Sequence, residues 1–321
     1  MRVASTRRSR DHRFEKARQT SDAIDWRIGD IQTWYEPNRF ASHKFLEVYN
    51  ARISNFDFTE IAGRYERDSL VQKAAAEVLI SMLEIGPQED VLDLGCGTGH
   101  LTERLSEITA GRVVGIDPAP GMIAQARSKY CSERISFEVA AAENLRPNAE
   151  FDVIFCNSVL HWFRDPARAL AACKRALRPA GRIGLQAPAR QDYCPNFLKG
   201  IAKVACHPET AATFSRFRSP WFLCETGDEY AEFCRDAGFI VPFARIEETS
   251  ARYSPEEVLK VFESGAAAGY LNATCYGVPM PNGYVESFRR ILADAFRAQA
   301  DGDGQVELVF HRIYLVAVRP D

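Results

Sequence analysis

The sequence lacks any apolar run long enough to span a lipid bilayer. Its most apolar stretches, such as Phe151–Ser158, fall far short of the roughly 18 residues that a span needs. It also lacks an excess of either charge, with 40 basic against 43 acidic residues. Bulk charge therefore gives no reason to expect a nucleic acid or an anionic membrane as a partner. With 46% hydrophobic and 26% charged residues and no internal repeat, the chain is typical of a globular protein.

The cysteines show no pattern of a disulfide framework or a metal site. There are nine, an odd number, and none form a Cys-x-x-Cys pair. Two of them, Cys96 and Cys156, lie in stretches that we expect to be buried, and we expect their side chains to be small core residues. This use of cysteine indicates a reducing, cytoplasmic location and no bound metal. Residues 1–20 are basic and polar without the apolar core of a secretory signal, so we expect a disordered start. A weak organelle transit peptide is the alternative.

The middle of the chain alternates between short apolar runs and helical patterns, which predicts successive βαβ units and a parallel sheet covered on both faces. Strands are expected at Val91–Leu94, Arg112–Ile116, Ile135–Ala140, Phe151–Asn157 and Arg182–Ala187. Helices are expected at Tyr65–Leu83, Gly121–Lys129 and Pro166–Leu177, and a further helical pattern runs through Leu101, Leu105 and Ile108.

After Pro188 this rhythm breaks. Residues 189–227 are rich in aromatics with only irregular helical spacing. Further on, helices are expected at Thr226–Ala237, Pro255–Ala268 and Tyr284–Ala298, and strands at Phe239–Glu247 and Gln305–Val318.

The strongest local signal is a glycine-rich turn, Asp93–Gly99, directly after a buried strand. Glycine allows positive φ and close approach of a ligand to the backbone, and the carboxyl end of such a strand faces the ligand crevice of an open α/β sheet. Asp117 ends the next strand, where a carboxylate can accept from both hydroxyls of a ribose. His100 stands where a dinucleotide fingerprint needs its third glycine, and the turn lacks the Gly-Lys-Ser/Thr of a P-loop. A nucleoside cofactor without a pyrophosphate fits this turn better.

Five segments in this order and spacing resemble the class I S-adenosylmethionine-dependent methyltransferases. They are VLDLGCGTGHLTERL, VVGIDPAPGMIAQAR, AAAENL, FDVIFCNSVLHWFRDP and LRPAGRIGL. The resemblance covers residues 58–188, with a weaker match from Thr226 to the end. It implies an α/β fold, doubly wound around a mostly parallel seven-stranded sheet (Rossmann-like), with a helical cap formed by late insertions. It also implies S-adenosyl-L-methionine as cofactor.

The resemblance also implies roles for individual residues. Gly95 and Gly97, with Asp93 upstream, would line the methionine and ribose portions of the cofactor, and Asp117 would hold the ribose. The remaining cofactor residues are Pro118 and Met122 beside the adenine, Ala142 donating its backbone N–H to the ring, and Asn157 beside the methionine portion. Met122 as a simple core residue is the alternative.

One position departs from the family pattern. Relatives usually carry an Asp before Ala-Glu-Asn-Leu to accept from the adenine amino group, and here that residue is Ala141. Losing one charge-assisted hydrogen bond costs about 1.5–3 kcal/mol, so we expect weaker cofactor binding.

Methyl transfer needs alignment and exclusion of water, and needs a base only if the nucleophile must lose a proton. His161, just after the fourth strand, is one catalytic candidate. Alternatively, His161 is a polar residue at the rim of the site or a packing partner of Trp162. Tyr65, before the first methyltransferase segment, is the second candidate, because relatives with Tyr there close that helix over the cofactor.

Within the family, the chain looks most like the trans-aconitate and malonyl-thioester carboxyl methyltransferases, which implies a small-molecule substrate methylated at an oxygen. The expected divisions are an N-terminal extension at 1–57, a cofactor-binding core at 58–188, a cap at 189–227, and the end of the sheet at 228–321 with a second cap segment at 252–304. Trp162, after the fourth strand, and Trp221 and Tyr270 of the cap would contact the substrate. The cap would also place a cation against a carboxylate. The candidate cations are Arg190, Lys199, Arg216 and Arg218.

Three alternatives remain at this stage. The basic tail Arg7–Arg18 could anchor an RNA or protein substrate, and Ala141 could mark a cofactor-binding protein without catalysis. The aromatic insertions could instead form the interface of a homodimer.

Overall fold

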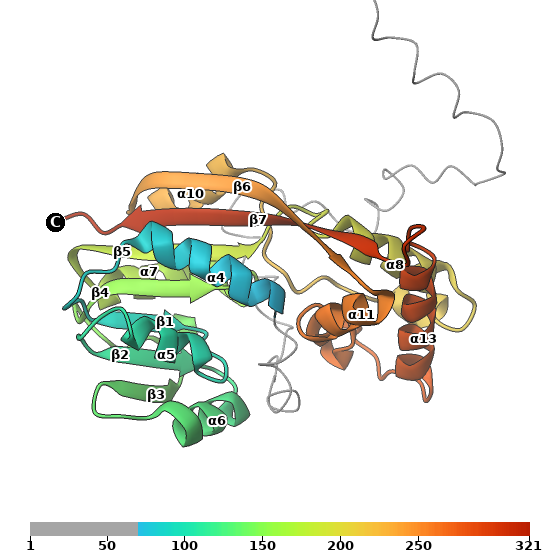
Figure 1. Cartoon of the computed structure of the whole chain (residues 1–321), viewed down its shortest axis with the longest axis horizontal. Helices are drawn as coiled ribbons and strands as arrows, with labels where there is room; N and C mark the ends of the chain where they lie inside the picture. Colours follow the sequence, from blue (N-terminus) through green and yellow to red (C-terminus); the bar gives the residue numbers. More distant parts are fainter. Residues whose placement is uncertain (1–69) are drawn as a thin grey trace, which may run out of the picture. The chain divides into compact units, whose positions relative to one another are not determined.

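The computed structural model describes residues 70–321 (Figure 1). The expectations for residues 1–69, among them Tyr65, the N-terminal extension and the basic tail, lie outside this range. The described residues form one open seven-stranded sheet in the order β3-β2-β1-β4-β5-β7-β6. Its strands are β1 (Val91–Leu94), β2 (Val113–Asp117), β3 (Ile135–Val139), β4 (Phe151–Asn157), β5 (Leu177–Pro188), β6 (Ile240–Tyr253) and β7 (Val306–Val318). Only β7 runs antiparallel to its neighbours within this sheet, which confirms the mostly parallel fold.

Helices cover both faces of the sheet, because alternate strand residues point to opposite sides. One face packs against α4 (Leu70–Leu83), α5 (His100–Ser106) and α6 (Pro120–Tyr130), and the other against α7 (Pro166–Ala176) and α10 (Gly227–Asp236). Neighbouring residues of β1 show the division, since Val91 belongs to the core under α4 whereas Leu92 belongs to the core under α7. The central strands therefore read as continuous apolar runs, as expected for a sheet buried on both faces.

Polar side chains fix where the helices begin on the second face. The Asp165 carboxylate accepts from the Arg168 backbone N–H at 3.0 Å, and Pro166 occupies the first turn of α7. At α10, Thr226 and Glu229 form a reciprocal capping box. Such caps satisfy the backbone donors that a helix start leaves without partners.

The late part of the chain differs from expectation in two places. Strand β6 continues to Tyr253, beyond the predicted end at Glu247, because it pairs with β7 up to Tyr253 and Val306. The single helix expected at Pro255–Ala268 is two helices, α11 (Pro255–Glu263) and α12 (Ala267–Tyr270), with Ser264 as the C-cap of α11. Residues 189–227, expected as part of a helical cap but with only irregular helical spacing, contain α8 (Pro195–Cys206) and the short α9 (Ala211–Phe214).

A second, aromatic core lies where β6 ends and β7 begins. Figure 1 shows α8, α11 and α13 (Tyr284–Arg297) gathered there. Phe197 of α8 contacts the rings of Phe262, Phe296 and Phe310 at centroid distances of 5.2, 5.8 and 5.5 Å. These helices thus form a layer with its own core, attached to the sheet through the long β6–β7 pair. Within residues 70–321, no helix has both the length and the apolar character of a membrane span.

Candidate active site

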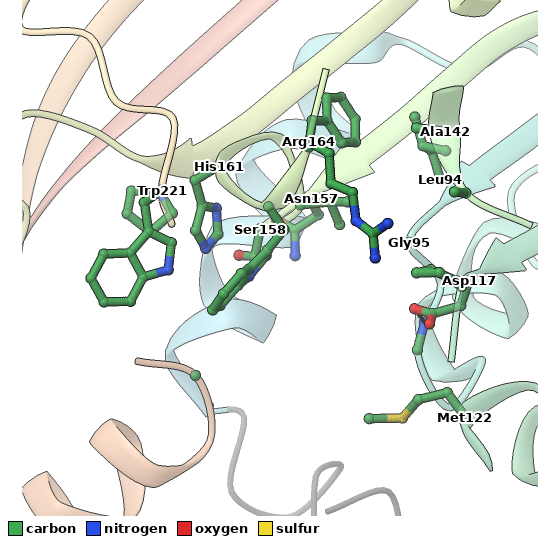
Figure 2. A pocket seen from close by; sticks show the side chains of 18 of the residues that line it. Leu94, Gly95, Asp117, Met122, Ala142, Asn157, Ser158, His161, Arg164 and Trp221 are labelled. Carbon is green, nitrogen blue, oxygen red and sulfur yellow. Dashed lines mark hydrogen bonds between the residues drawn. The ribbon is translucent and has the colours of Figure 1, made fainter. Parts of the chain in front are cut away.

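A cavity of about 550 Å³ lies at the carboxyl ends of the parallel strands, a volume typical of a small-molecule site. The loops after β1, β2, β3 and β4 line one part, and residues of the aromatic layer and β7 line the other. Figure 2 shows Asp117 and Met122 at one end of the cavity and His161 and Trp221 at the other.

The glycine-rich turn forms the floor of the first end. Gly95 has φ +78°, and a Cβ there would lie 2.2 Å from a methyl group of Val159. Its N–H and that of Cys96 donate to the Ile116 carbonyl at 2.8 and 2.9 Å, which ties the turn to the end of β2. No side chain fits at Gly95, so the backbone itself lines the cavity.

Asp117 holds the same turn from the next strand. Its Oδ2 accepts from the Gly97 N–H at 3.1 Å and its Oδ1 accepts from the Ala119 N–H at 2.8 Å. Gly97 also has positive φ, at +54°. The two bonds fix the orientation of a carboxylate that lines the cavity.

Asp93 does not line the cavity. Its side chain is buried, and its Oδ2 accepts from the Thr102 hydroxyl at 2.6 Å, linking β1 to α5. Burial raises the pKa of this carboxyl to about 7, against the opposing effect of the Thr102 hydrogen bond and with a further rise from the charge of Asp117. Asp93 therefore supports the turn from behind.

Pro118, Met122, Ala141 and Ala142 line the cavity beyond Asp117. Ala141 is the N-cap residue of a short 3₁₀ helix, η3 (Ala142–Asn144). The neighbouring Glu143 carboxylate accepts from the backbone N–H groups of Arg164 and Asp165 at 2.9 and 3.3 Å, so it is engaged with the start of α7.

Asn157 and Ser158 line the middle of the cavity. Ser158 has φ +60°, a strained conformation for a residue other than glycine, and its hydroxyl donates to Gln186 Oε1 at 3.0 Å. Strain of this kind is found preferentially at functional sites.

His161 and two tryptophans define the second end. The His161 side chain is 8% exposed, and its Nδ1 has no hydrogen-bond partner among residues 70–321. Burial, with a smaller contribution from the charge of Arg312, lowers the pKa of His161 to about 3, so the imidazole is neutral at physiological pH. Trp162 and Trp221 meet edge to face at a centroid distance of 5.9 Å.

Arg312 of β7 also lines this end and is 4% exposed. Its guanidinium carbon lies 4.7 Å from the centroid of the Phe310 ring, and burial lowers the pKa of the group. An arginine buried at a cavity wall is a strong electrostatic attractor for an anion, because little water screens it.

Comparisons with known proteins agree with this geometry. Residues 92–185 match the model of a methyltransferase domain family. The chain is 27% identical over 259 residues to a trans-aconitate 2-methyltransferase of Methylobacterium nodulans, covering 80% of this chain and 97% of the relative. It is also 36% identical over 128 residues to a malonyl-[acyl-carrier protein] O-methyltransferase of Hahella chejuensis, covering 39% of this chain and 46% of the relative. Residues 92–185 thus form a methyltransferase domain, and the chain is a methyltransferase.

Solved structures share the fold of this methyltransferase. The YcgJ protein of Bacillus subtilis superposes with a TM-score of 0.52 at 17% identity, covering 78% of this chain and 99% of that one. A methyltransferase solved in complex with the Haloferax volcanii Trm112 activator gives a TM-score of 0.51 at 18% identity, covering 83% and 96%.

Most of the residues expected to bind the cofactor of this methyltransferase surround one cavity. The lining set contains Gly95, Gly97, Asp117, Pro118, Met122, Ala141, Ala142 and Asn157, together with His161, Trp162 and Trp221. Tyr270 is not part of it, because its ring is fully buried behind Trp221 at a centroid distance of 4.8 Å. The cations suggested by the sequence, Arg190, Lys199, Arg216 and Arg218, do not line the cavity either.

Arg312 and Ser158 also line the cavity and were not predicted from the sequence. The signal for Arg312 was its place within the apolar run of the last strand, where a long charged side chain is rarely buried unless paired or functional. For Ser158 the signal was weaker, namely a small residue following a buried strand.

Proposed function

We propose that this enzyme transfers the methyl group of S-adenosylmethionine to a carboxylate oxygen of a small acid. The observation that carries the proposal is Arg312, a buried guanidinium at the end of the cavity away from the glycine-rich turn. The names of the two relatives support the reaction class, since both describe methyl transfer to compounds with carboxyl groups.

The turn end of the cavity fits the cofactor. The Asp117 carboxylate is oriented by the Gly97 and Ala119 N–H groups, and we assign it the ribose hydroxyls. The buried Met122 and Ala142 form the apolar walls that an adenine ring requires. When bound, the cofactor supplies a methyl group that is already activated on a sulfonium sulfur.

The residues of the second end orient an acceptor that needs no deprotonation. A carboxyl group with an ordinary pKa near 4 is ionised at neutral pH, so general-base catalysis is not required. His161, with a pKa of about 3, is a weak base and is suited to accept or donate a hydrogen bond as a neutral ring. Arg312 holds the acid, and the aromatic wall excludes water from the reacting atoms.

The test uses the purified full chain, cofactor labelled in its methyl group, and a mixture of small carboxylic acids. A carboxyl methyl ester releases its methyl group as methanol in mild base, whereas an ether or a methylamine does not. We expect label in a base-labile product.

Two variants then test the site. Arg312→Gln should lower kcat/KM for the acid by about 10- to 100-fold, the value of a hydrogen-bonded charge, without changing cofactor affinity. Arg190→Gln is the matched control, because Arg190 is half-exposed, pairs with Asp192 at 2.8 Å and does not line the cavity. Base-stable product formed equally well by Arg312→Gln would contradict the proposal.

A further inference from the structure

The acceptor end of the cavity is a largely apolar chamber around one charged group. Its lining includes Tyr193, Phe197, Trp221, Leu223, Val261 and Phe310. These side chains come from the residues just before α8, from α8 itself, from the segment before α10, and from α11 and β7, and each is at most 7% exposed. Such a wall favours burial of hydrocarbon in a ligand.

Positive charge at this end comes from Arg312 alone among the lining residues that the structure describes. The other lining arginines, Arg164 and Arg168, stand at the start of α7. Arg168 donates to the Glu143 carbonyl at 3.1 Å and to Asn144 Oδ1 at 3.0 Å, and Figure 2 shows the Arg164 guanidinium turned toward Gly95 and Asp117. Both therefore belong to the cofactor end.

Negative charge is distributed in the same way. The acidic side chains that line the cavity within residues 70–321 are Asp117, Glu143 and Asp165, from the loops that surround the cofactor end. The acceptor end thus presents one cation, one neutral imidazole, the hydroxyl group of Tyr193 and otherwise mostly apolar walls.

This arrangement matches one carboxylate and a hydrocarbon group. A second carboxylate on the substrate would be buried against tryptophan, leucine and valine side chains, and burying a charge without a partner is costly. Resting on the proposed function, we propose that the substrate is a monocarboxylic acid with an apolar tail, its carboxylate at Arg312 and its tail against Trp221, Leu223 and Val261. A polycarboxylic acid does not fit this chamber.

The experiment compares four probes under identical conditions. Octanoate and phenylacetate each carry one carboxylate and an apolar group, whereas succinate and tricarballylate carry two and three carboxylates. We expect base-labile methyl esters from the first pair with kcat/KM about tenfold or more above that of the second pair. A higher kcat/KM for succinate or tricarballylate would overturn this inference and leave the proposed function standing. Absence of ester from all four, with label in a base-stable product from a cell extract, would overturn both.

A pair of matched variants tests the tail assignment. Val261→Ala removes two methyl groups from the chamber wall and should shift the octanoate-to-phenylacetate ratio of kcat/KM several-fold, since a methylene-sized change in a pocket alters discrimination by roughly 10-fold. Val258→Ala is the control, because Val258 lies on the same helix, is equally buried and does not line the cavity. If both variants leave the ratio at the wild-type value, or both shift it alike, the tail does not contact Val261 and the inference fails.

Discussion

Replacing Asp93 with asparagine should stabilise the protein increasingly as the pH rises. The Asp93 carboxyl is buried behind the glycine-rich turn, accepts a hydrogen bond from Thr102 at 2.6 Å, and has its pKa raised to about 7 by burial. Asparagine keeps an oxygen to accept from Thr102 but carries no charge. The substitution therefore removes the cost of ionising a buried group and retains its hydrogen bond.

The sign and size follow from proton linkage. In the unfolded chain an Asp titrates near 3.9, so between about pH 4 and pH 7 the folded state holds a proton that the unfolded state releases. Stability of the wild type then falls as pH rises, at about 1.4 kcal/mol per pH unit for this group. From about pH 5 to about pH 8, the free energy of unfolding of Asp93→Asn should rise relative to wild type by about 2–3 kcal/mol.

Urea unfolding followed by circular dichroism at the two pH values measures this difference. Asp90→Asn is the control of opposite sign. Asp90 pairs with Arg178 at 2.7 Å and has a lowered pKa, so its charged form stabilises the fold at both pH values, and Asp90→Asn should be destabilised by the same amount at pH 5 and pH 8. A difference between Asp93→Asn and wild type that stays constant with pH would refute the assignment of a raised pKa to Asp93.

Three further predictions concern the cavity. Asp117→Ala should weaken S-adenosylmethionine binding by about 10- to 100-fold, the value of a hydrogen bond to a charged group, and an unchanged calorimetric Kd in the folded variant would contradict the ribose assignment. Ala141→Asp should tighten binding several-fold by supplying an acceptor at the cavity wall, whereas weaker binding would mean that the adenine lies elsewhere. Trp221→Leu should raise the KM for the acid acceptor and leave the cofactor Kd unchanged; a changed Kd alone would place Trp221 with the cofactor.

The parallel part of the sheet could be predicted because its signals are local. Strands β1, β2 and β4 are buried on both faces and read as apolar runs. The turn that follows such a strand can itself require a particular residue type. Gly95 is one example, since its positive φ and the 2.2 Å approach of Val159 to a Cβ exclude any side chain. Short-range requirements of this kind are visible in the sequence without knowledge of the rest of the fold.

The late elements depend on distant contacts and were predicted less well. The second half of β6 is polar and mostly exposed, and its strand conformation comes from pairing with β7. Helix α8 carries Gly200, which packs so closely that a Cβ there would lie 2.5 Å from a methyl group of Leu292, and Asn196, whose Oδ1 accepts from the Val309 N–H at 3.1 Å. Neither residue favours a helix by itself, so the local pattern is weak.

The individual residues of the aromatic part of the cavity wall could not be predicted from the sequence. Aromatic residues were expected there from 189–227 and 252–304, and the buried arginine of the lining, Arg312, belongs to β7. Tyr270 was expected to contact substrate and is a core residue behind Trp221. Which aromatic faces the cavity is decided by how the helical layer packs, and spacing along the chain does not encode that.

The position of Arg312 leads to a last prediction, on the relation between stability and activity. Burial lowers the pKa of its guanidinium, which means that the folded state disfavours the charged form relative to water. Arg312→Met fills a similar volume without charge and removes the cost of keeping a guanidinium buried in its charged form. We therefore expect Arg312→Met to unfold at a higher urea concentration while losing acid methylation. Arg178→Met should do the opposite, because Arg178 is partly exposed, pairs with Asp90 and Asp152, and does not line the cavity. If Arg312→Met is instead destabilised and remains active, the guanidinium serves folding, and the acid must be held by another group.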